Sequence, residues 1–367
     1  MQKKYKLNAA SWFVCVISTV LNMMSCISQK ADGMVFNDVV YPVGGHPSSI
    51  LEGGEEILHD VDFKVGVKVI DSLMFLYTLN KEKAYKVVLL PKYKIVGEFF
   101  SQGHGKNEFV QVPSLYRSVS FYSKGKDICA TVYDFDLGKM YDVNFSQNIS
   151  QQSNDMKSCK YLFMRNLGSC LLLDSVYNDN AKFFVQDVSP LNGGNYPIGI
   201  CFKGKVNNSI GSLDVLNNYK MESRDRTPQI SSLYSLCRER KMIVQMPLYL
   251  NYINIIDLNG ESSKTVLCDY EMVDAKKCDN YKNGNNYFTC VNAYDNYFVV
   301  RCSKTYRNSF LFYSYQGVLL YELYCDDGSQ VFDIDNANGM LYTINYKDFC
   351  LKQYDISNVL TNMCKNL

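Results

Sequence analysis

After residue 30 the chain alternates short apolar runs with polar turns, and the 3.6-residue periodicity of amphipathic helices is hard to find. The runs are rich in Val, Ile, Tyr and Phe, and Asn, Asp and Gly separate them, as is typical of strands. They form six clusters, at residues 72–100, 127–145, 169–188, 241–260, 296–324 and 339–357. The pattern therefore predicts an all-β protein.

A loose unit recurs through these clusters: an apolar strand, a polar turn, a second strand that ends near Tyr or Asp, and a tight turn into a third strand. The tight turns fall near Pro91, Gly138, Pro190, Gly260, Gly317 and Ser357. Their average spacing of about 53 residues suits a four-stranded sheet. Because radial repetition protects sheet edges, we expect residues 55–367 to form a six-bladed β-propeller of four-stranded antiparallel blades. Two β-sandwich domains are the alternative.

The first 25 residues read as an export leader. A basic segment, MQKKYKLN, precedes the apolar run AASWFVCVISTVLNMM, which is short for a transmembrane span. Ser25, a small residue, then precedes Cys26, and the order resembles a bacterial lipoprotein signal. That resemblance implies that residues 1–25 are removed, that Cys26 is acylated, and that residues 26–54 form a tether. An ordinary secretory signal or an uncleaved anchor is the alternative.

One glycine-rich stretch, GEFFSQGHGKNEFVQVP at residues 97–113, invites comparison with phosphate-binding loops. Glu108 stands where a dinucleotide fingerprint needs its third glycine, and a Walker loop would need Gly-Lys-Ser/Thr. We therefore interpret it as architecture, in which glycines permit positive φ and an aromatic ring is buried between sheets. The residues that carry this interpretation are Gly103, Gly105, Glu108, Phe109 and Pro113.

The same residues resemble the loop that precedes a blade in NHL-type and TolB-like six-bladed propellers, G-x-G-x-x-E-F with a proline nearby. With the leader, residues 55 to about 360 resemble the TolB-like propeller lipoproteins of Bacteroidetes-type bacteria. The resemblance implies a location in the cell envelope, at the outer membrane, facing the periplasm or the exterior. The other blades lack the loop, which leaves their boundaries open.

Charge gives no reason to expect nucleic acid as a partner. The 367 residues carry a formal charge of +1, and removal of the three leader lysines leaves 35 basic against 37 acidic residues. Twelve of the 14 cysteines follow Cys26, many of them inside apolar runs and without metal-ligand spacing, so we interpret most as core thiols. Cys268 and Cys278 form the closest candidate disulfide outside a single strand.

The sequence offers little catalytic chemistry. Only His46, His59 and His104 are present, all in the first third of the chain, and we place them in loops or at strand ends. Acidic clusters could hold calcium, but we favour the interpretation that they form the turns before inner strands. These clusters contain Asp134 and Asp136, Asp326 and Asp327, and Asp333, Asp335, Asn336 and Asn338. We expect no catalytic residue, metal or cofactor.

We therefore favour a binding or scaffolding protein over an enzyme, with a small ligand or an envelope protein at the propeller mouth and membrane contact through the lipid anchor only. The alternative is a calcium-dependent propeller hydrolase of the lactonase or esterase type. An inert structural subunit is a third possibility. The long connection at residues 205–232 is the first candidate for a partner site away from the axis. The basic residues Arg224, Arg226, Arg238, Arg240 and Lys241 are interpreted as a solvated face.

Overall fold

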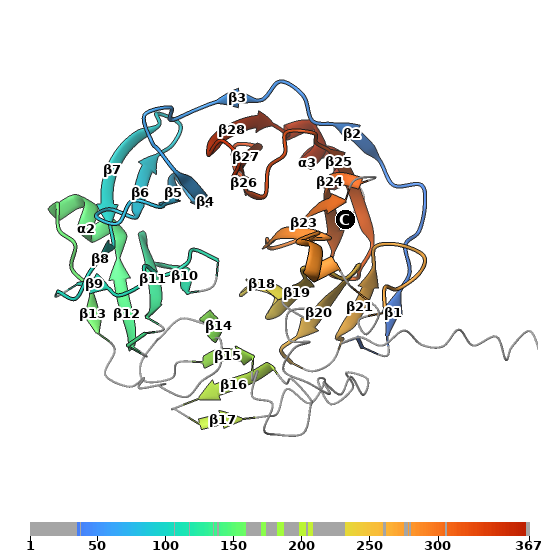
Figure 1. Ribbon diagram of the computed structural model, residues 1–367, viewed down its shortest axis with the longest axis horizontal. Helices are drawn as coiled ribbons and strands as arrows, with labels where there is room; N and C mark the ends of the chain where they lie inside the picture. Colours follow the sequence, from blue (N-terminus) through green and yellow to red (C-terminus); the bar gives the residue numbers. More distant parts are fainter. Residues whose placement is uncertain are drawn as a thin grey trace, which may run out of the picture.

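The computed structural model describes residues 35–158 and 232–364 apart from a few short gaps, and between them only the backbone of four strands. Antiparallel sheets follow one another around a central axis (Figure 1), which is the arrangement of a β-propeller. The prediction of an all-β propeller is confirmed.

Five blades surround the axis, each made mainly from consecutive strands. The first contains β4 (Lys64–Ile70), β5 (Leu73–Thr78), β6 (Tyr85–Leu89) and β7 (Lys94–Phe99). The second contains β10 (Val119–Lys124), β11 (Asp127–Asp134), β12 (Lys139–Asn144) and β13 (Lys157–Ser158). The third contains β18 (Ser232–Cys237), β19 (Met242–Pro247), β20 (Tyr252–Asp257) and β21 (Lys264–Leu267). The fourth contains β22 (Phe288–Ala293), β23 (Tyr297–Lys304), β24 (Arg307–Ser314) and β25 (Leu319–Tyr324). The fifth contains β26 (Val331–Asp335), β27 (Met340–Asn345) and β28 (Cys350–Asp355).

The expectation of six uniform, four-stranded antiparallel blades is wrong. We count as blades the five sheets of four or five strands whose side chains are described, and the described sheets contain two to five strands. Four further strands pair with one another, but the structure describes only their backbone. They are β14 (Cys170–Leu173), β15 (Lys182–Gln186), β16 (Ile198–Phe202) and β17 (Lys205–Asn207). Uniformity fails because the N-terminal segment adds a fifth strand, paired in parallel, to two of the blades.

That segment supplies β1 (Val39–Val40), β2 (Ser48–Ile50) and β3 (Glu55–Glu56) to the outer edges of successive blades. Strand β1 pairs in parallel with β21, and β2 pairs in parallel with β25. Strand β3 pairs antiparallel with β28 and completes the fifth blade, so the two ends of the propeller are joined within one sheet. The segment expected to be a tether thus covers edges that would otherwise be unpaired.

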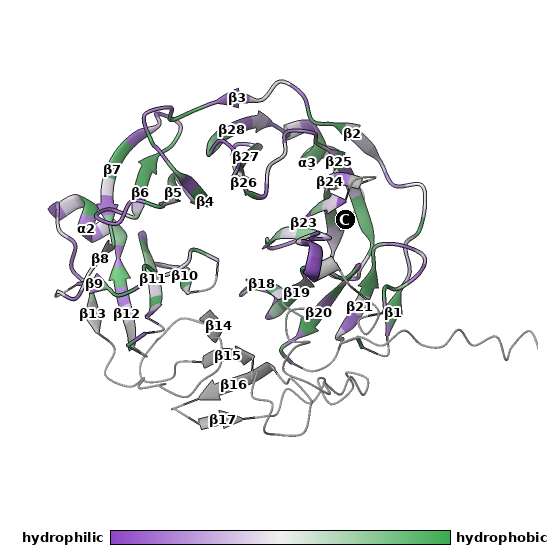
Figure 2. Cartoon of the chain, viewed as in Figure 1, coloured by the Kyte–Doolittle hydropathy of each residue, from purple (hydrophilic) through white to green (hydrophobic). Residues whose placement is uncertain are grey.

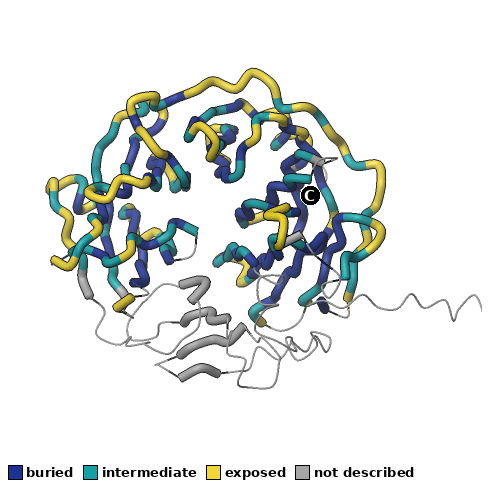
Figure 3. The backbone as a smooth tube through the Cα atoms, in the orientation of Figure 1, coloured by how far each residue is buried: buried dark blue, intermediate teal, exposed yellow. Residues whose placement is uncertain are grey.

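The core consists of apolar layers between neighbouring blades. One layer joins the fourth, fifth and first blades, another joins the third and fourth, and a third joins the first and second. Strands such as β20 and β26 are buried along their whole length because a blade lies on each face. Figure 2 shows apolar residues along the blade strands, and Figure 3 shows buried residues concentrated there.

Short helices and a small sheet complete the described chain. They are α2 (Phe145–Gln151), η5 (Asn280–Asn283), α3 (Ser357–Cys364), β8 (Ser101–Gln102) and β9 (Glu108–Phe109). Asn144 caps α2, since its side-chain oxygen accepts from the Gln147 amide at 2.8 Å. In the part of the chain that the structure describes, no helix has the length and apolar character needed to cross a membrane.

Candidate binding site at the mouth of the central channel

A cavity of about 690 Å³ opens at one end of the axis. Its wall is formed by the innermost strands of all five blades (β4, β10, β18, β22 and β26), by the turns that follow several of them, and by two side chains of α3. The volume is in the range of pockets that hold small ligands. Because each wall comes from a different blade, the propeller itself sets the positions of the lining side chains.

Asp333 of β26 is a buried carboxylate beside this cavity and has partners from two other blades. Its side chain is fully buried and accepts hydrogen bonds from the Lys68 amine at 3.2 Å, the Tyr294 hydroxyl at 2.8 Å and the Val69 amide at 2.6 Å. Lys68 is on β4 and Tyr294 follows β22, so three blades meet at one carboxylate. A buried charge needs such partners, because an unpaired one would be strongly destabilising.

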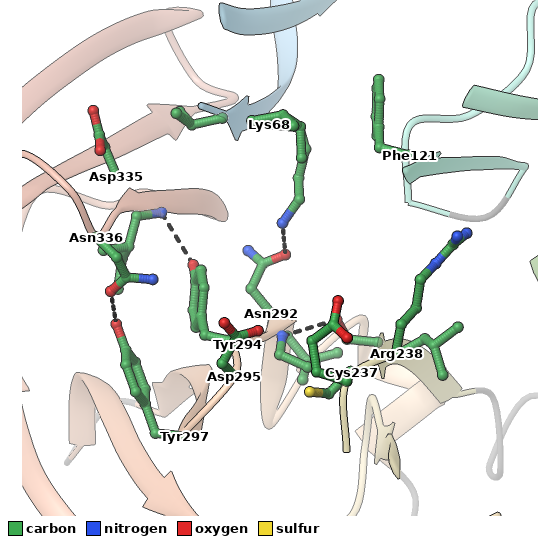
Figure 4. A pocket seen from close by; sticks show the side chains of 18 of the residues that line it. Lys68, Phe121, Cys237, Arg238, Asn292, Tyr294, Asp295, Tyr297, Asp335 and Asn336 are labelled. Carbon is green, nitrogen blue, oxygen red and sulfur yellow. Dashed lines mark hydrogen bonds between the residues drawn. The ribbon is translucent and has the colours of Figure 1, made fainter. Parts of the chain in front are cut away.

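Lys68 links the same three blades a second time. Its amine also donates to the Asn292 side-chain oxygen at 3.5 Å, and Figure 4 shows it extending from β4 toward β22. Asn292 in turn donates to the Phe332 carbonyl at 2.6 Å. The Lys68 amine lies 5.6 Å from the centre of the Tyr294 ring, which adds a cation–π contact. The wall is therefore organised before any ligand binds.

Tyrosine hydroxyls provide further fixed polar groups. Tyr297 donates to the Asn336 side-chain oxygen (Figure 4), and the Tyr116 hydroxyl donates to the Val67 carbonyl at 3.1 Å. The pKa of Tyr294 is raised well above its ordinary value, first by burial and then by Asp333. Its hydroxyl consequently stays protonated at physiological pH and acts as a donor.

Arg238 forms the opposite wall, at the end of β18. Its guanidinium donates to the Ser120 hydroxyl on β10 and lies 5.8 Å from the centre of the Tyr122 ring. Arg240, two positions later, is not one of the residues that line the cavity, but it donates to the side-chain oxygen of one of them, Asn296, at 2.9 Å. The basic cluster that we expected to be a solvated face thus contributes one arginine to the cavity.

Exposed acids surround the opening. Asp71, Glu239 and Asp295 lie in the turns after β4, β18 and β22 and line the cavity. Together with Lys68, Arg238 and the aromatic ring of Phe121, they give the mouth both signs of charge and an apolar surface. Such a set suits recognition of a polar ligand through hydrogen bonds, with an aromatic contact to fix its orientation.

The candidate calcium ligands are occupied by contacts within the protein. Asp335 accepts from the Ala337 and Asn338 amides at 3.1 Å each, which makes it a turn-forming residue before β27. Asp134 accepts in the same way from the Asp136 amide at 3.0 Å. Among the described residues, no group of three or more His, Cys, Asp and Glu side chains could hold a metal ion.

Asp327 belongs to a second buried network, remote from the cavity lining. It accepts hydrogen bonds from the Thr343 hydroxyl at 2.9 Å and the Tyr354 hydroxyl at 3.0 Å. The fully buried guanidinium of Arg301 lies 3.9 Å away and donates to the carbonyls of Ser329, Cys302 and Cys325. Burial alone would raise the pKa of Asp327, but hydrogen bonds from Cys325, Ser329 and Thr343 outweigh it, so this pKa lies below its usual value.

The glycine-rich loop lies between the first two blades. The Glu108 carboxylate accepts from the Gly105 amide at 2.7 Å, and a Cβ at Gly103 or Gly105 would collide with that carboxylate. Phe109 is fully buried, 5.3 Å from the Phe100 ring centre. The Pro113 carbonyl accepts from the Tyr85 hydroxyl at 2.7 Å. Positive φ falls on Asn107 rather than on either glycine, so the glycines provide close approach instead.

The histidines and cysteines have structural contacts. His46 lies 3.1 Å from the Glu322 carboxylate and His59 lies 3.3 Å from that of Glu56, while His104 is exposed in the glycine-rich loop. The eight cysteines whose side chains the structure describes are buried thiols, and Cys278 donates to the Tyr249 carbonyl at 3.5 Å. The candidate disulfide between Cys268 and Cys278 is therefore not formed.

Two sequence-based sites lie outside the described residues. Cys26 and the whole leader precede Val35, where the description begins, and most of the connection 205–232 is also outside it. Within that connection only Lys205–Asn207 and Ser232 are described, as parts of β17 and β18. Arg224 and Arg226 are likewise outside.

The cavity residues that the sequence analysis missed are chiefly Lys68, Asn292 and Tyr294. A faint signal for Lys68 exists, since it is a charged residue within the apolar strand Lys64–Ile70. Its partner Asp333 was noted only as a cation ligand. Nothing in the local sequence connects these residues, because Lys68 and Asp333 are separated by 265 positions.

No protein-family model and no curated protein matches the sequence, but solved structures share its fold. An exported protein from Bacteroides fragilis is 11% identical, with a TM-score of 0.50 over 86% of this chain and 98% of its own. A DUF4221 family member from Bacteroides vulgatus is 8% identical, with a TM-score of 0.50 over 83% and 96%. Regucalcin from Agrobacterium tumefaciens, a calcium-binding protein, is 8% identical, with a TM-score of 0.44 over 84% and 95%. The first two establish the β-propeller fold alone.

Proposed function

We propose that this protein is an exported binding module, tethered to the cell envelope through an acylated Cys26, that holds a polar ligand in the mouth of its central channel. The ligand is either a small molecule or a protruding segment of an envelope protein. The single observation that carries the proposal is the preformed cavity of about 690 Å³, whose polar wall is fixed by contacts between blades.

Export is supported by the leader and Ser25–Cys26 in the sequence, and by the exported protein of Bacteroides fragilis that has the same fold. Binding, rather than calcium-dependent hydrolysis, is supported by the contacts that the carboxylates beside the cavity already make within the protein. Asp333 and Asp335 are engaged by amides, a hydroxyl and Lys68, whereas a calcium site would need their oxygens for the ion.

The test compares two arginines that are close in sequence. A library of sugars, organic acids and peptides is screened by thermal shift against the wild-type chain, and each hit is then measured by calorimetry with Arg238→Met and Arg240→Met. Because Arg238 lines the cavity and Arg240 does not, Arg238→Met should raise the Kd at least tenfold, while Arg240→Met should change it by less than about twofold.

Equal Kd values for both variants would place the ligand elsewhere, and failure of every compound and peptide to bind would count against the channel as a binding site. The anchor is tested separately. Cys26→Ser should move the protein from the membrane fraction to the soluble fraction, and an unchanged distribution would contradict acylation.

A further inference from the structure

The N-terminal residues 39–50, here called the strap, run along the outer circumference of the third and fourth blades (Figure 1). The backbone of the strap pairs with β21 through β1 and with β25 through β2. His46, between the two strands, contacts the buried carboxylate of Glu322 at 3.1 Å. The strap is therefore held at three points, and its side chains that point outward have fixed positions.

The strap is unusually apolar for an outer surface. One residue in five of the chain is charged, yet VVYPVGGHPSSI contains no Asp, Glu, Lys or Arg. Tyr41 is 60% exposed, Val43 is 76% exposed and Ile50 is 66% exposed. Figure 3 shows that much of this segment is accessible, and edge strands usually carry charges instead.

Two apolar residues of the fourth blade extend this surface. Tyr324 is the register partner of Ile50, and Val318 follows the tight turn at Gly317, which packs against Val40 of the strap. Both are exposed, at 40% and 53%. We define the rim patch as Tyr41, Val43, Ile50, Val318 and Tyr324. Grouped exposed apolar side chains of this kind mark interaction sites more often than scattered ones do.

The start of the described chain indicates what faces this patch. Val35 and Phe36 are buried, and Val35 packs against the third blade, beneath the beginning of the strap. Cys26 is nine positions before Val35, so even a fully extended connection spans only about 30 Å. An acyl chain on Cys26 would therefore hold the outer edge of the third blade close to the bilayer, and the strap lies on that edge.

We propose that the rim patch rests on the lipid bilayer, so that the propeller stands on the edge of its third and fourth blades. This inference rests on the acyl anchor of the proposed function. Tyrosine is favoured at the membrane interface, and the uncharged strap can approach lipid without desolvating an ion. The patch would add apolar contact area beside the acyl chains on Cys26.

The test uses a tryptophan introduced at one position. The only Trp of the chain is Trp12, in the leader, so the acylated mature protein has no other indole to interfere. Tyr41→Trp places a reporter in the rim patch, and Leu79→Trp places one at an apolar residue of the first blade that is 54% exposed. Both acylated variants are bound to phosphatidylcholine vesicles with and without brominated acyl chains.

We expect a blue shift and bromine quenching of the indole in Tyr41→Trp, and neither in Leu79→Trp. Equal quenching of both indoles, or quenching of neither while the protein floats with the vesicles, would overturn the orientation. Mass spectrometry of the mature N-terminus separates this failure from failure of the anchor. An unmodified N-terminus would refute both the anchor and the bilayer as the occupant of the patch.

A second variant tests the patch without relying on fluorescence. In the full chain carrying Cys26→Ser, Val43→Asp should lower the partition onto the same vesicles by about tenfold, whereas Leu79→Asp should leave it unchanged. Equal effects of the two substitutions would contradict the proposal. A concentration-dependent dimer that Val43→Asp dissolves would assign the patch to a second copy of the chain and would also overturn it.

Discussion

The ion pair between Lys68 and Asp333 joins the first blade to the fifth, and its removal tests whether contacts at the axis stabilise the ring. The perturbation is Lys68→Met, which keeps most of the side-chain volume and removes the charge. Asp333 would remain fully buried with two of its three donors, the Tyr294 hydroxyl and the Val69 amide.

The expected cost follows from the geometry. At 3.2 Å, and with an effective dielectric constant near 20, the attraction is about 5 kcal/mol. Breaking a buried pair by removing one partner costs roughly 3–5 kcal/mol. The Lys68 side chain is 22% exposed, and two donors to Asp333 persist, so we expect a loss of about 2–3 kcal/mol in the free energy of unfolding.

The matched control is the ion pair between Lys86 on β6 and Glu98 on β7, which are neighbouring strands of the first blade. Their side chains are 17% and 36% exposed, so Lys86→Met should cost less than about 1 kcal/mol. Denaturant unfolding and calorimetry of both variants provide the measurement. A double-mutant cycle with Asp333→Asn should give a coupling energy of about 2 kcal/mol.

One result would refute this reasoning. If Lys68→Met and Lys86→Met lowered stability by the same amount within about 0.5 kcal/mol, the carboxylate of Asp333 would not depend on its partner across the axis. The organised wall of the cavity would then have to come from the backbone of the blades alone.

Three further predictions concern other parts of the ring. Gly317→Ala should lower the melting temperature more than Gly125→Ala. Both glycines have positive φ, which costs an alanine about 1 kcal/mol, but only at Gly317 would the added Cβ also meet the Val266 side chain, at 2.9 Å. Burial raises the pKa of the Cys290 thiol to about 12, against about 8.5 in the unfolded chain. The buried neutral thiol therefore contributes its full stability below pH 8.5, and this contribution declines as the pH rises toward 12. The melting temperature should thus fall less between pH 8 and pH 10.5 in Cys290→Ala than in wild type. Arg301→Met should cost about 3–5 kcal/mol in denaturant unfolding, because it leaves buried carbonyls without donors, and a loss below 1 kcal/mol would contradict this.

Local patterns predicted the strands well because the blades are built from consecutive hairpins. Runs such as residues 72–79 and 339–345 contain the residues that form β5 and β27. Blade number was wrong because the predicted repeat treated all six clusters alike. The strap was missed because strands of two or three residues, such as β1 and β2, leave no periodic signal.

The sequence predicted where the candidate site lies but not which residues form it. A mouth at the axis followed from the propeller, whereas its members come from five strands far apart in sequence. Arg238 was set aside because acidic residues stand beside it in sequence. Its position against Ser120 depends on how the blades meet, and a charge pattern carries no information about that.

The order in which the N-terminal strands find their partners has a consequence for how the chain folds. Strands β1, β2 and β3 pair with β21, β25 and β28, all of which lie in the last third of the sequence. Synthesis from the N-terminus produces these three strands early and their partners late. The ring therefore cannot close until nearly the whole polypeptide has been made.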